Sequence, residues 1–229
     1  PISNIPCGTS RAGLATQRSS VVCWNKLSGK ALSPVLSWQD RRAADWLRQF
    51  APQELRVREL TGLPLSPHYG VSKLRWCLDN LAEVKHCASI GELAAGPLAS
   101  YLVYQLLAEH PLLVDPANAS RTLLYDFTTL DWSDELARLF GVPLSVLPAT
   151  TSSLSTYGTL DVAGHAVPFA LLTGDQSAAL YGFGAARSDT VYANLGTGAF
   201  LQRPSGSVPA TAPGLLASVV YTDSGTREY

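Results

Sequence analysis

The distribution of apolar and polar positions predicts short strands that alternate with helices. One apolar run over residues 167–172 (VPFALL) has the length of a buried strand, and it ends at Thr173-Gly174. Asp175 and Gln176 follow at the turn, before a small-residue helix over 177–181. Open α/β sheets bind ligands at the carboxyl ends of their strands, which gives Asp175 a functional position. Aspartate is also a favoured helix N-cap, and taken alone the residue favours that structural role.

The same patterning divides the remaining chain. Strands are expected over 12–16 and 21–24, with Gly29 supplying the left-handed residue of the turn after them. A further strand over 35–38 leads into a helix that begins at Asp40 as its cap. Ser133 caps and Gly141 stops another helix. The predicted helices cover 40–50, 72–80, 91–107 (with a break near Pro97) and 133–141; the later strands cover 159–162, 167–172, 190–195, 199–202 and 217–221; residues 110–122 and 150–156 are expected to be loop and linker.

Composition narrows the class of protein. The chain has 229 residues, 46% of them hydrophobic and 15% charged, with a net charge of −1, which indicates a folded core. No basic patch suggests nucleic acid, and the apolar runs are too short to cross a membrane. Without a signal peptide or a disulfide pattern among four cysteines, a cytoplasmic protein is expected. The absence of methionine, even at position 1, suggests that the sequence is partial.

Two further polar constellations could carry chemistry. Gly196-Thr197-Gly198 joins two predicted strands, and its backbone N–H groups could hold a phosphate, although a plain hairpin would use the same glycines. Arg18 and Trp38 each follow a strand, where a cation and an aromatic face suit a polyhydroxylated ligand. Equally, Arg18 could pair with Asp40 while Trp38 packs in the core. The cysteines and histidines match no zinc spacing, and the standard nucleotide-binding motifs are absent.

Five ordered segments resemble the FGGY family of carbohydrate kinases, closest to its glycerol kinase branch. These segments are ATQRSSVVCWNKLSGKAL, SWQDRRAADW, DPANASRTLLYDFTTLDWSDELARLFGVP, TGDQSAALYG and NLGTGAF. The resemblance implies an α/β, ribonuclease H-like (actin-like ATPase) domain with a mixed sheet flanked by helices. It also implies transfer of the ATP γ-phosphate, with Mg²⁺, to a sugar or polyol hydroxyl. Residues 1–229 would form most of the N-terminal substrate-binding domain, without the C-terminal nucleotide-binding domain.

The resemblance also assigns roles to individual residues. Asp175 matches the family's catalytic base. Helix-dipole stabilisation at the start of a helix would keep that carboxylate ionised. The implied contacts are Arg18, Trp38, Gln176, Phe200 and His68 for the sugar or polyol, and Gly196 and Thr197 for the nucleotide phosphates; no metal ligand is assigned.

Departures from the family pattern bear on the substrate. Ser19 stands where glycerol kinases carry a glutamate, and His68, next to Tyr69, stands where they carry a tyrosine. A sugar or polyol other than glycerol, and larger, is therefore expected. The D-x-G-T-type strand is also missing, because Pro6 precedes Cys7-Gly8-Thr9 where an aspartate should stand.

Two other functions remain open at this stage. A truncated, kinase-derived domain could bind a carbohydrate or a protein partner without transferring phosphate. An actin-like assembly protein would share the fold, but that reading rests on fold alone. The oligomeric state is also open, with a homodimer as one arrangement to test.

Overall fold

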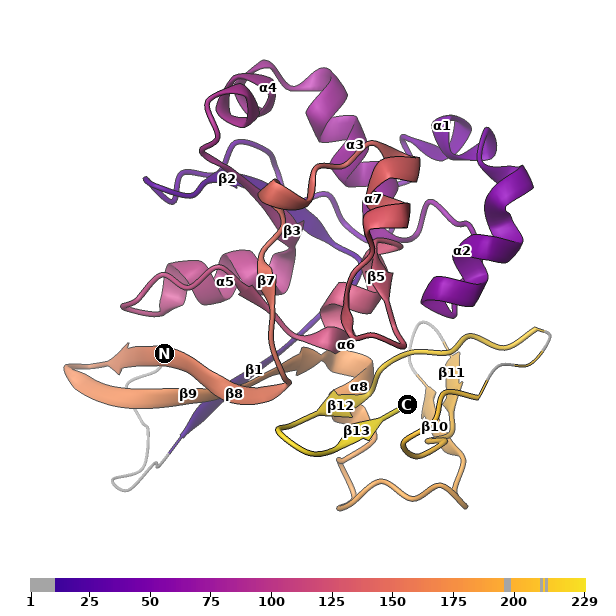
Figure 1. Cartoon of the computed structure of the whole chain (residues 1–229). Helices are drawn as coiled ribbons and strands as arrows, with labels where there is room; N and C mark the ends of the chain where they lie inside the picture. Colours follow the sequence, from indigo (N-terminus) through magenta and orange to yellow (C-terminus); the bar gives the residue numbers. More distant parts are fainter. Residues whose placement is uncertain (1–10, 196–198, 211, 213) are drawn as a thin grey trace.

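A computed structural model describes residues 11–195, 199–210, 212 and 214–229. At its base lies a three-stranded mixed sheet of β1 (Ala12–Thr16), β9 (His165–Gly174) and β8 (Leu154–Val162), in the order β1-β9-β8 (Figure 1). β1 runs parallel to β9, and Thr16 pairs with Gly174 at the carboxyl ends of the two strands. The apolar run predicted over 167–172 is therefore a strand, as expected, and its end meets the end of β1.

A second sheet lies inside the helical part of the molecule. β2 (Val21–Asn25) pairs antiparallel with β3 (Leu93–Pro97), and almost every residue of both strands is buried. Such continuous burial is expected of strands covered on both faces. α5 (Leu98–Leu106) packs between this pair and the three-stranded sheet, where Val103 contacts a cluster that includes Phe169 and Leu172.

The remaining helices surround the larger core. Leu74 and Val84 lie at its centre, on α3 and α4, with Phe140 of α7. α7 begins and ends as its sequence predicts, because the Ser133 hydroxyl accepts a hydrogen bond from the Leu136 N–H and Gly141 adopts a left-handed backbone. The helices are α1 (Ala44–Arg48), α2 (Glu54–Thr61), α3 (Gly70–Asn80), α4 (Ala82–Ser89), α6 (Pro116–Ala119), α7 (Asp134–Phe140) and α8 (Asp175–Ala179), with 3-10 turns at Ala51–Gln53, Ser120–Thr122 and Leu144–Val146.

Several local predictions were wrong. The helix expected over 91–107 is a strand up to Pro97, because the small residues of β3 pass through the core beside β2. Asp40 caps no helix; its carboxylate binds Arg42, and α1 begins later with Ala43 as its N-cap. Residues 35–38 form only an isolated bridge from Leu36 to Val21. The loop expected over 110–122 contains β4 (Leu113–Val114), α6 and a 3-10 turn. The linker expected over 150–156 is occupied by the end of β7 (Ala149–Thr150) and the start of β8. The strand expected over 217–221 is replaced by the shorter β12 (Tyr221–Thr222).

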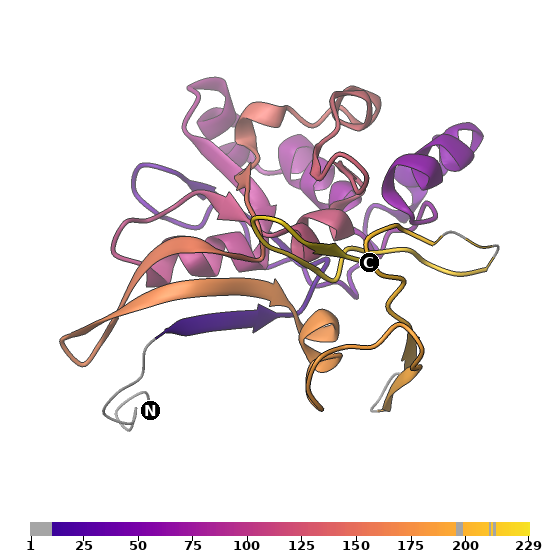
Figure 2. The same ribbon diagram turned by 60° about the horizontal axis from the view of Figure 1, so that its bottom comes forward.

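The C-terminal segment leaves the three-stranded sheet and then packs back against the rest of the domain. β10 (Tyr192–Leu195) and β11 (Ala199–Gln202) form a separate hairpin beyond α8 (Figure 2). The chain then packs back, with Val219 and Tyr229 against Phe127. β12 and β13 (Arg227–Glu228) close this part, and β5 (Tyr125–Asp126) pairs with β6 (Asp131–Trp132) nearby. No helix in the described ranges is long and apolar enough to cross a membrane.

Candidate active site

The parallel ends of β1 and β9 bring Arg18 and Asp175 to one edge of the sheet. Thr16 pairs with Gly174, so that the residues just beyond each strand emerge side by side (Figure 2). Gly174 allows this approach, because a Cβ atom there would collide with Cδ of Arg18 and lie 2.7 Å from its Cγ. Replacing this glycine by any other residue would therefore displace the arginine.

Asp175 is the first residue of α8, and its side chain is exposed to solvent. The prediction that it caps the helix was wrong, because Gly174 occupies the N-cap position. The Asp175 carboxylate instead accepts a hydrogen bond from the Gln176 N–H at 2.7 Å. Asp175 thus presents an accessible carboxylate at the carboxyl edge of the sheet.

Gln176 connects this edge to the β10–β11 hairpin. Its side-chain oxygen accepts a hydrogen bond from the Asn194 amide at 3.5 Å, and Asn194 pairs with Phe200 across the hairpin. The Phe200 side chain is 48% exposed. The structure therefore links two of the predicted substrate contacts, Gln176 and Phe200, through one residue.

Trp38, His68 and Tyr69 form a row of aromatic rings. The ring centroids of Trp38 and His68 lie 5.4 Å apart, and those of His68 and Tyr69 lie 5.2 Å apart. Trp38 is 37% exposed, so the expectation that it could be a core residue is not met. Aromatic faces of this kind pack against the C–H groups of sugars and polyols.

Lys73 fixes the backbone that carries this row. Its ammonium donates hydrogen bonds to the carbonyls of Pro67, His68 and Tyr69, at 2.9, 2.6 and 3.0 Å. Burial lowers the pKa of Lys73 to about 8, with Asp40 opposing the shift. Sequence reasoning missed this residue because a lysine on an amphipathic helix ordinarily faces solvent.

Two buried arginines, Arg18 and Arg121, place positive charge at the site. Burial, followed by the nearby charge of Arg121, lowers the pKa of Arg18 to about 9, while Asp175 and Asp115 oppose this. Burial also lowers the pKa of Arg121, opposed by Tyr69 and Asp175. A guanidinium stays charged at neutral pH, so both shifts report surroundings that disfavour positive charge. Arg18 is not ion-paired with Asp40, which binds Arg42.

A buried polar network supports the end of β1. The Thr16 hydroxyl donates to the side-chain oxygen of Asn118, whose amide donates to Asp115 at 2.7 Å. Asp115 also caps α6 by accepting the Asn118 N–H. Burial raises the pKa of Asp115 to about 6, against the lowering effect of the Asn118 hydrogen bonds. Asp115, Asn118 and Arg121 were not predicted as site residues, because their segment has the composition of a loop.

The phosphate-binding prediction cannot be placed, because Gly196 and Thr197 lie outside the described residues. Within the described ranges, no group of three or more His, Cys, Asp or Glu side chains could hold a metal ion. Among the described residues, Cys23, Cys77 and Cys87 are free thiols.

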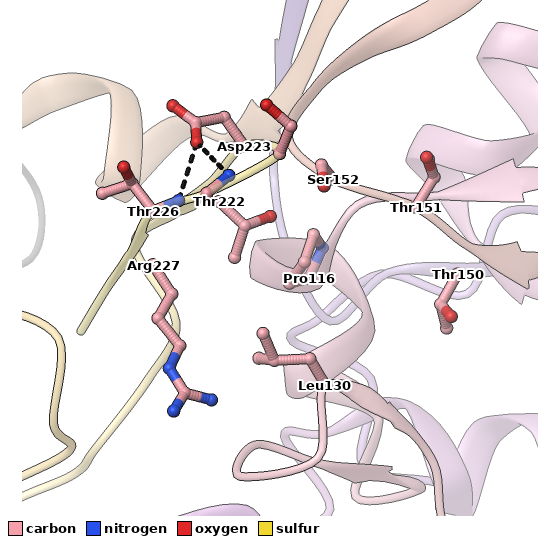
Figure 3. A pocket seen from close by; sticks show the side chains of 11 residues that line it. Pro116, Leu130, Thr150, Thr151, Ser152, Thr222, Asp223, Thr226 and Arg227 are labelled. Carbon is pink, nitrogen blue, oxygen red and sulfur yellow. Dashed lines mark hydrogen bonds between the residues drawn. The ribbon is translucent and has the colours of Figure 1, made fainter.

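A cavity of about 430 Å³ lies elsewhere, between the end of β7 with the two residues after it and the β12–β13 hairpin (Figure 3). Hydroxyl groups of Thr150, Thr151 and Ser152 line one side of it. Asp223 lines the other side, where its carboxylate accepts the N–H groups of Gly225 and Thr226 at 3.0 and 2.8 Å. None of the predicted site residues lines this cavity.

The mixed sheet, with acidic and basic residues at its carboxyl edge, is the ribonuclease H-like fold of the actin-like ATPases. Plasmodium falciparum glycerol kinase, solved with ADP, superposes with a TM-score of 0.88 at 26% identity, over 96% of this chain and 45% of that one. Gluconate kinase from Lactobacillus acidophilus shares the fold, with a TM-score of 0.82 at 18% identity, over 98% of this chain and 46% of that one. The predicted fold class, an α/β domain of the ribonuclease H-like type, is thus confirmed.

This chain belongs to the FGGY family of carbohydrate kinases, whose N-terminal-domain model matches residues 6–182. Glycerol kinase from Geobacter sp. (strain M21) is 37% identical over 220 residues, covering 94% of this chain and 44% of the relative. Glycerol kinase from Myxococcus xanthus is 39% identical over 220 residues, covering 93% and 44%. The chain therefore spans less than half the length of these curated relatives.

Proposed function

We propose that the protein containing this chain transfers the γ-phosphoryl group of ATP to a hydroxyl of a sugar or polyol. The observation that carries the proposal is the exposed Asp175 carboxylate, held beside Arg18 at the carboxyl ends of two parallel strands. Membership of a carbohydrate kinase family supports it, as do relatives that are named glycerol kinases.

Each residue of the site has a role in this reaction. Asp175 takes the proton of the attacking hydroxyl as its oxygen bonds to the γ-phosphorus and the bond to ADP breaks. Arg18 and Gln176 hold the other hydroxyls, while Trp38, His68 and Phe200 pack against the C–H faces. Phosphoryl transfer depends mainly on positioning and charge stabilisation, so one accessible carboxylate is sufficient for the proton.

ATP and Mg²⁺ are the cofactors of the proposed reaction. Gly196 and Thr197 are proposed to meet the nucleotide phosphates. The described residues include no cluster of metal ligands, so they do not by themselves fit a Mg²⁺ site. No step is therefore assigned to the metal through this chain.

Replacement of Asp175 tests the role of the base. Asp175→Asn keeps the size of the side chain but removes its basicity, and should lower kcat by about 10²–10⁴-fold, the usual contribution of a general base. The measurement is ADP release with a panel of sugars and polyols, on the intact protein that contains this chain. Asp134→Asn is the matched control, because Asp134 is also exposed in the first turn of a helix. Equal turnover by wild type and Asp175→Asn would disprove this assignment.

The same assay of ADP release with sugars and polyols distinguishes a kinase from a domain that binds a ligand without phosphotransfer. A kinase-derived domain without phosphotransfer would bind a carbohydrate or a protein partner and release no ADP. We further propose that residues 1–229 supply most of the substrate-binding domain and act in the cytoplasm on a small-molecule substrate, without a nucleic acid or membrane partner. Light scattering of the purified protein would test for a homodimer.

A further inference from the structure

Helix α8 carries Asp175 but is too short to hold its own position. It has five residues, from Asp175 to Ala179, and hydrogen-bonded turns extend it to Gly182, whose N–H donates to the Ala179 carbonyl. Isolated helices shorter than about 12–15 residues are marginal in water, so tertiary contacts must fix the direction of this one. β9 holds its first residue, because Asp175 directly follows Gly174 at the end of that strand. The contacts at its other end therefore bear on where the Asp175 carboxylate lies.

Tyr181 joins the end of α8 to the β12–β13 hairpin beside it (Figure 1). Its hydroxyl donates a hydrogen bond to the Glu228 carboxylate of β13 at 2.6 Å. Its ring packs edge-on against Tyr221 of β12, with 6.3 Å between the ring centroids and an interplanar angle of 62°. Burial, followed by the hydrogen bond to Glu228, raises the pKa of Tyr181, so the phenol remains a donor at neutral pH. Hydrogen bonds to a charged acceptor are among the stronger ones in proteins.

The β12–β13 hairpin is itself fixed to the sheet that leads to Asp175. Ser153 and Thr222 exchange two hydrogen bonds, because the backbone N–H of each donates to the hydroxyl of the other, at 3.0 and 3.2 Å. Both residues are buried, and the Ser153 carbonyl accepts the N–H of Leu172 in β9 at 3.0 Å. The contacts therefore form a closed circuit from β9 through the hairpin and Tyr181 back to α8.

We propose that Tyr181 and Glu228 are positioning residues for Asp175, because their hydrogen bond holds α8 in the orientation that directs the carboxylate at the attacking hydroxyl. This inference rests on the proposed function, since it gives both residues a part in the same reaction. Rate depends steeply on such geometry, and a displacement of about 1 Å can cost about 100-fold. The bond should affect kcat more than KM, because Arg18 and the row of aromatic rings lie outside α8.

Kinetics of the intact protein with ATP, Mg²⁺ and a panel of sugars and polyols test the inference. Tyr181→Phe keeps the ring contact but removes the hydroxyl, and it should lower kcat by about tenfold while KM for the acceptor rises less than about threefold. Glu228→Leu should give the same loss, whereas Glu228→Gln keeps an oxygen acceptor and should keep most of the activity. Tyr101→Phe is the control and should leave kcat unchanged, since this hydroxyl donates to the Gly29 carbonyl in another part of the chain.

A double variant separates a shared role from independent effects. If the two side chains act through their hydrogen bond, Tyr181→Phe combined with Glu228→Leu should have the same kcat as either single variant. Losses that multiply in the double variant, or a kcat in Tyr181→Phe equal to that of wild type, would overturn the inference. An equal loss in Glu228→Gln and Glu228→Leu would also overturn it, because glutamine restores the acceptor.

Hydrogen exchange distinguishes this inference from the proposed function. In Tyr181→Phe the amides of residues 179–182 should exchange at least about fivefold faster than in wild type, while those of α7 stay unchanged. Faster exchange, together with a wild type that releases no ADP with any acceptor, would support the link between Tyr181 and α8 and refute the kinase reaction. Unchanged exchange in Tyr181→Phe would overturn the inference, whatever the turnover.

Discussion

Replacing Lys73 by methionine should loosen the segment that carries His68 and Tyr69. Lys73 is 1% exposed, and its ammonium donates to three successive carbonyls, those of Pro67, His68 and Tyr69. Methionine has a similar length and fills the same space, but it donates no hydrogen bond. The three carbonyls would then lose the donor that holds them in place.

The expected magnitude comes from two opposing contributions. A hydrogen bond from a charged donor contributes roughly 1.5–3 kcal/mol, so that three contribute roughly 4.5–9 kcal/mol. Burial opposes this by lowering the pKa of Lys73 from 10.5 to about 8, which corresponds to about 3 kcal/mol. The net loss in free energy of unfolding for Lys73→Met is therefore roughly 1.5–6 kcal/mol.

Urea unfolding, followed by tryptophan fluorescence, measures this loss. Lys85→Met is the control, because Lys85 is exposed on α4, and it should change stability by less than about 0.5 kcal/mol. In kinetic assays, Lys73→Met should raise KM for the sugar or polyol more than KM for ATP, because the aromatic row shifts. A free energy of unfolding equal to that of the control would contradict the reasoning.

The difference in free energy of unfolding between wild type and Lys73→Met should also depend on pH. The pKa of Lys73 is about 8 in the folded chain and 10.5 when unfolded, so the unfolded chain binds more protons between these values. Wild-type stability relative to Lys73→Met should therefore rise with pH across this window, by about 3 kcal/mol in total. A difference that stays constant from pH 8 to 10.5 would exclude a buried, charged Lys73.

Two further substitutions test the sheet edge. Gly174→Ala should push Arg18 away from Asp175 and lower kcat/KM at least about tenfold. Gly225→Ala is the control, because it adds a Cβ in open space and should leave kcat/KM unchanged. Full activity in Gly174→Ala would show that Arg18 need not stay in place. Asp115→Asn tests the buried network by its pH profile. Because the pKa of Asp115 is raised from 3.8 to about 6 on folding, wild type should lose about 3 kcal/mol relative to Asp115→Asn as pH rises from 4 to 6. Parallel stability curves for the two proteins over that window would rule out the raised pKa.

The location of Asp175 and Arg18 at the ends of strands could be predicted from sequence, because each follows a segment with the pattern of a strand. The run before Asp175 and the shorter one before Arg18 both have strand length; Asp175 comes directly after β9, and Arg18 is the second residue after β1. What the sequence could not supply is the register. The pairing of Thr16 with Gly174 is set by tertiary packing between distant segments, which leaves no periodic signal in either strand.

The missed elements have identifiable physical causes. Leu93, Ala94 and Ala95 suit a helix by local preference, but burial beside β2 makes this segment a strand. Asp115 and Arg121 lie in a segment rich in Pro, Asn and Ser, which resembles a surface loop although much of it is buried. Lys73 resembles a surface lysine until its three backbone partners are known. In each case tertiary context decided the outcome.

The pairing of Thr16 with Gly174 also has a consequence for folding kinetics. Most of the chain separates these two residues, and closing so long a loop makes their contact slow to form. The core around Leu74 and Val84 draws on α3 and α4, which are adjacent in the chain, and can form earlier. Refolding should therefore pass through a species with a tryptophan signal but no functional site. Substrate binding should return only with the slowest phase, when the two distant strands meet.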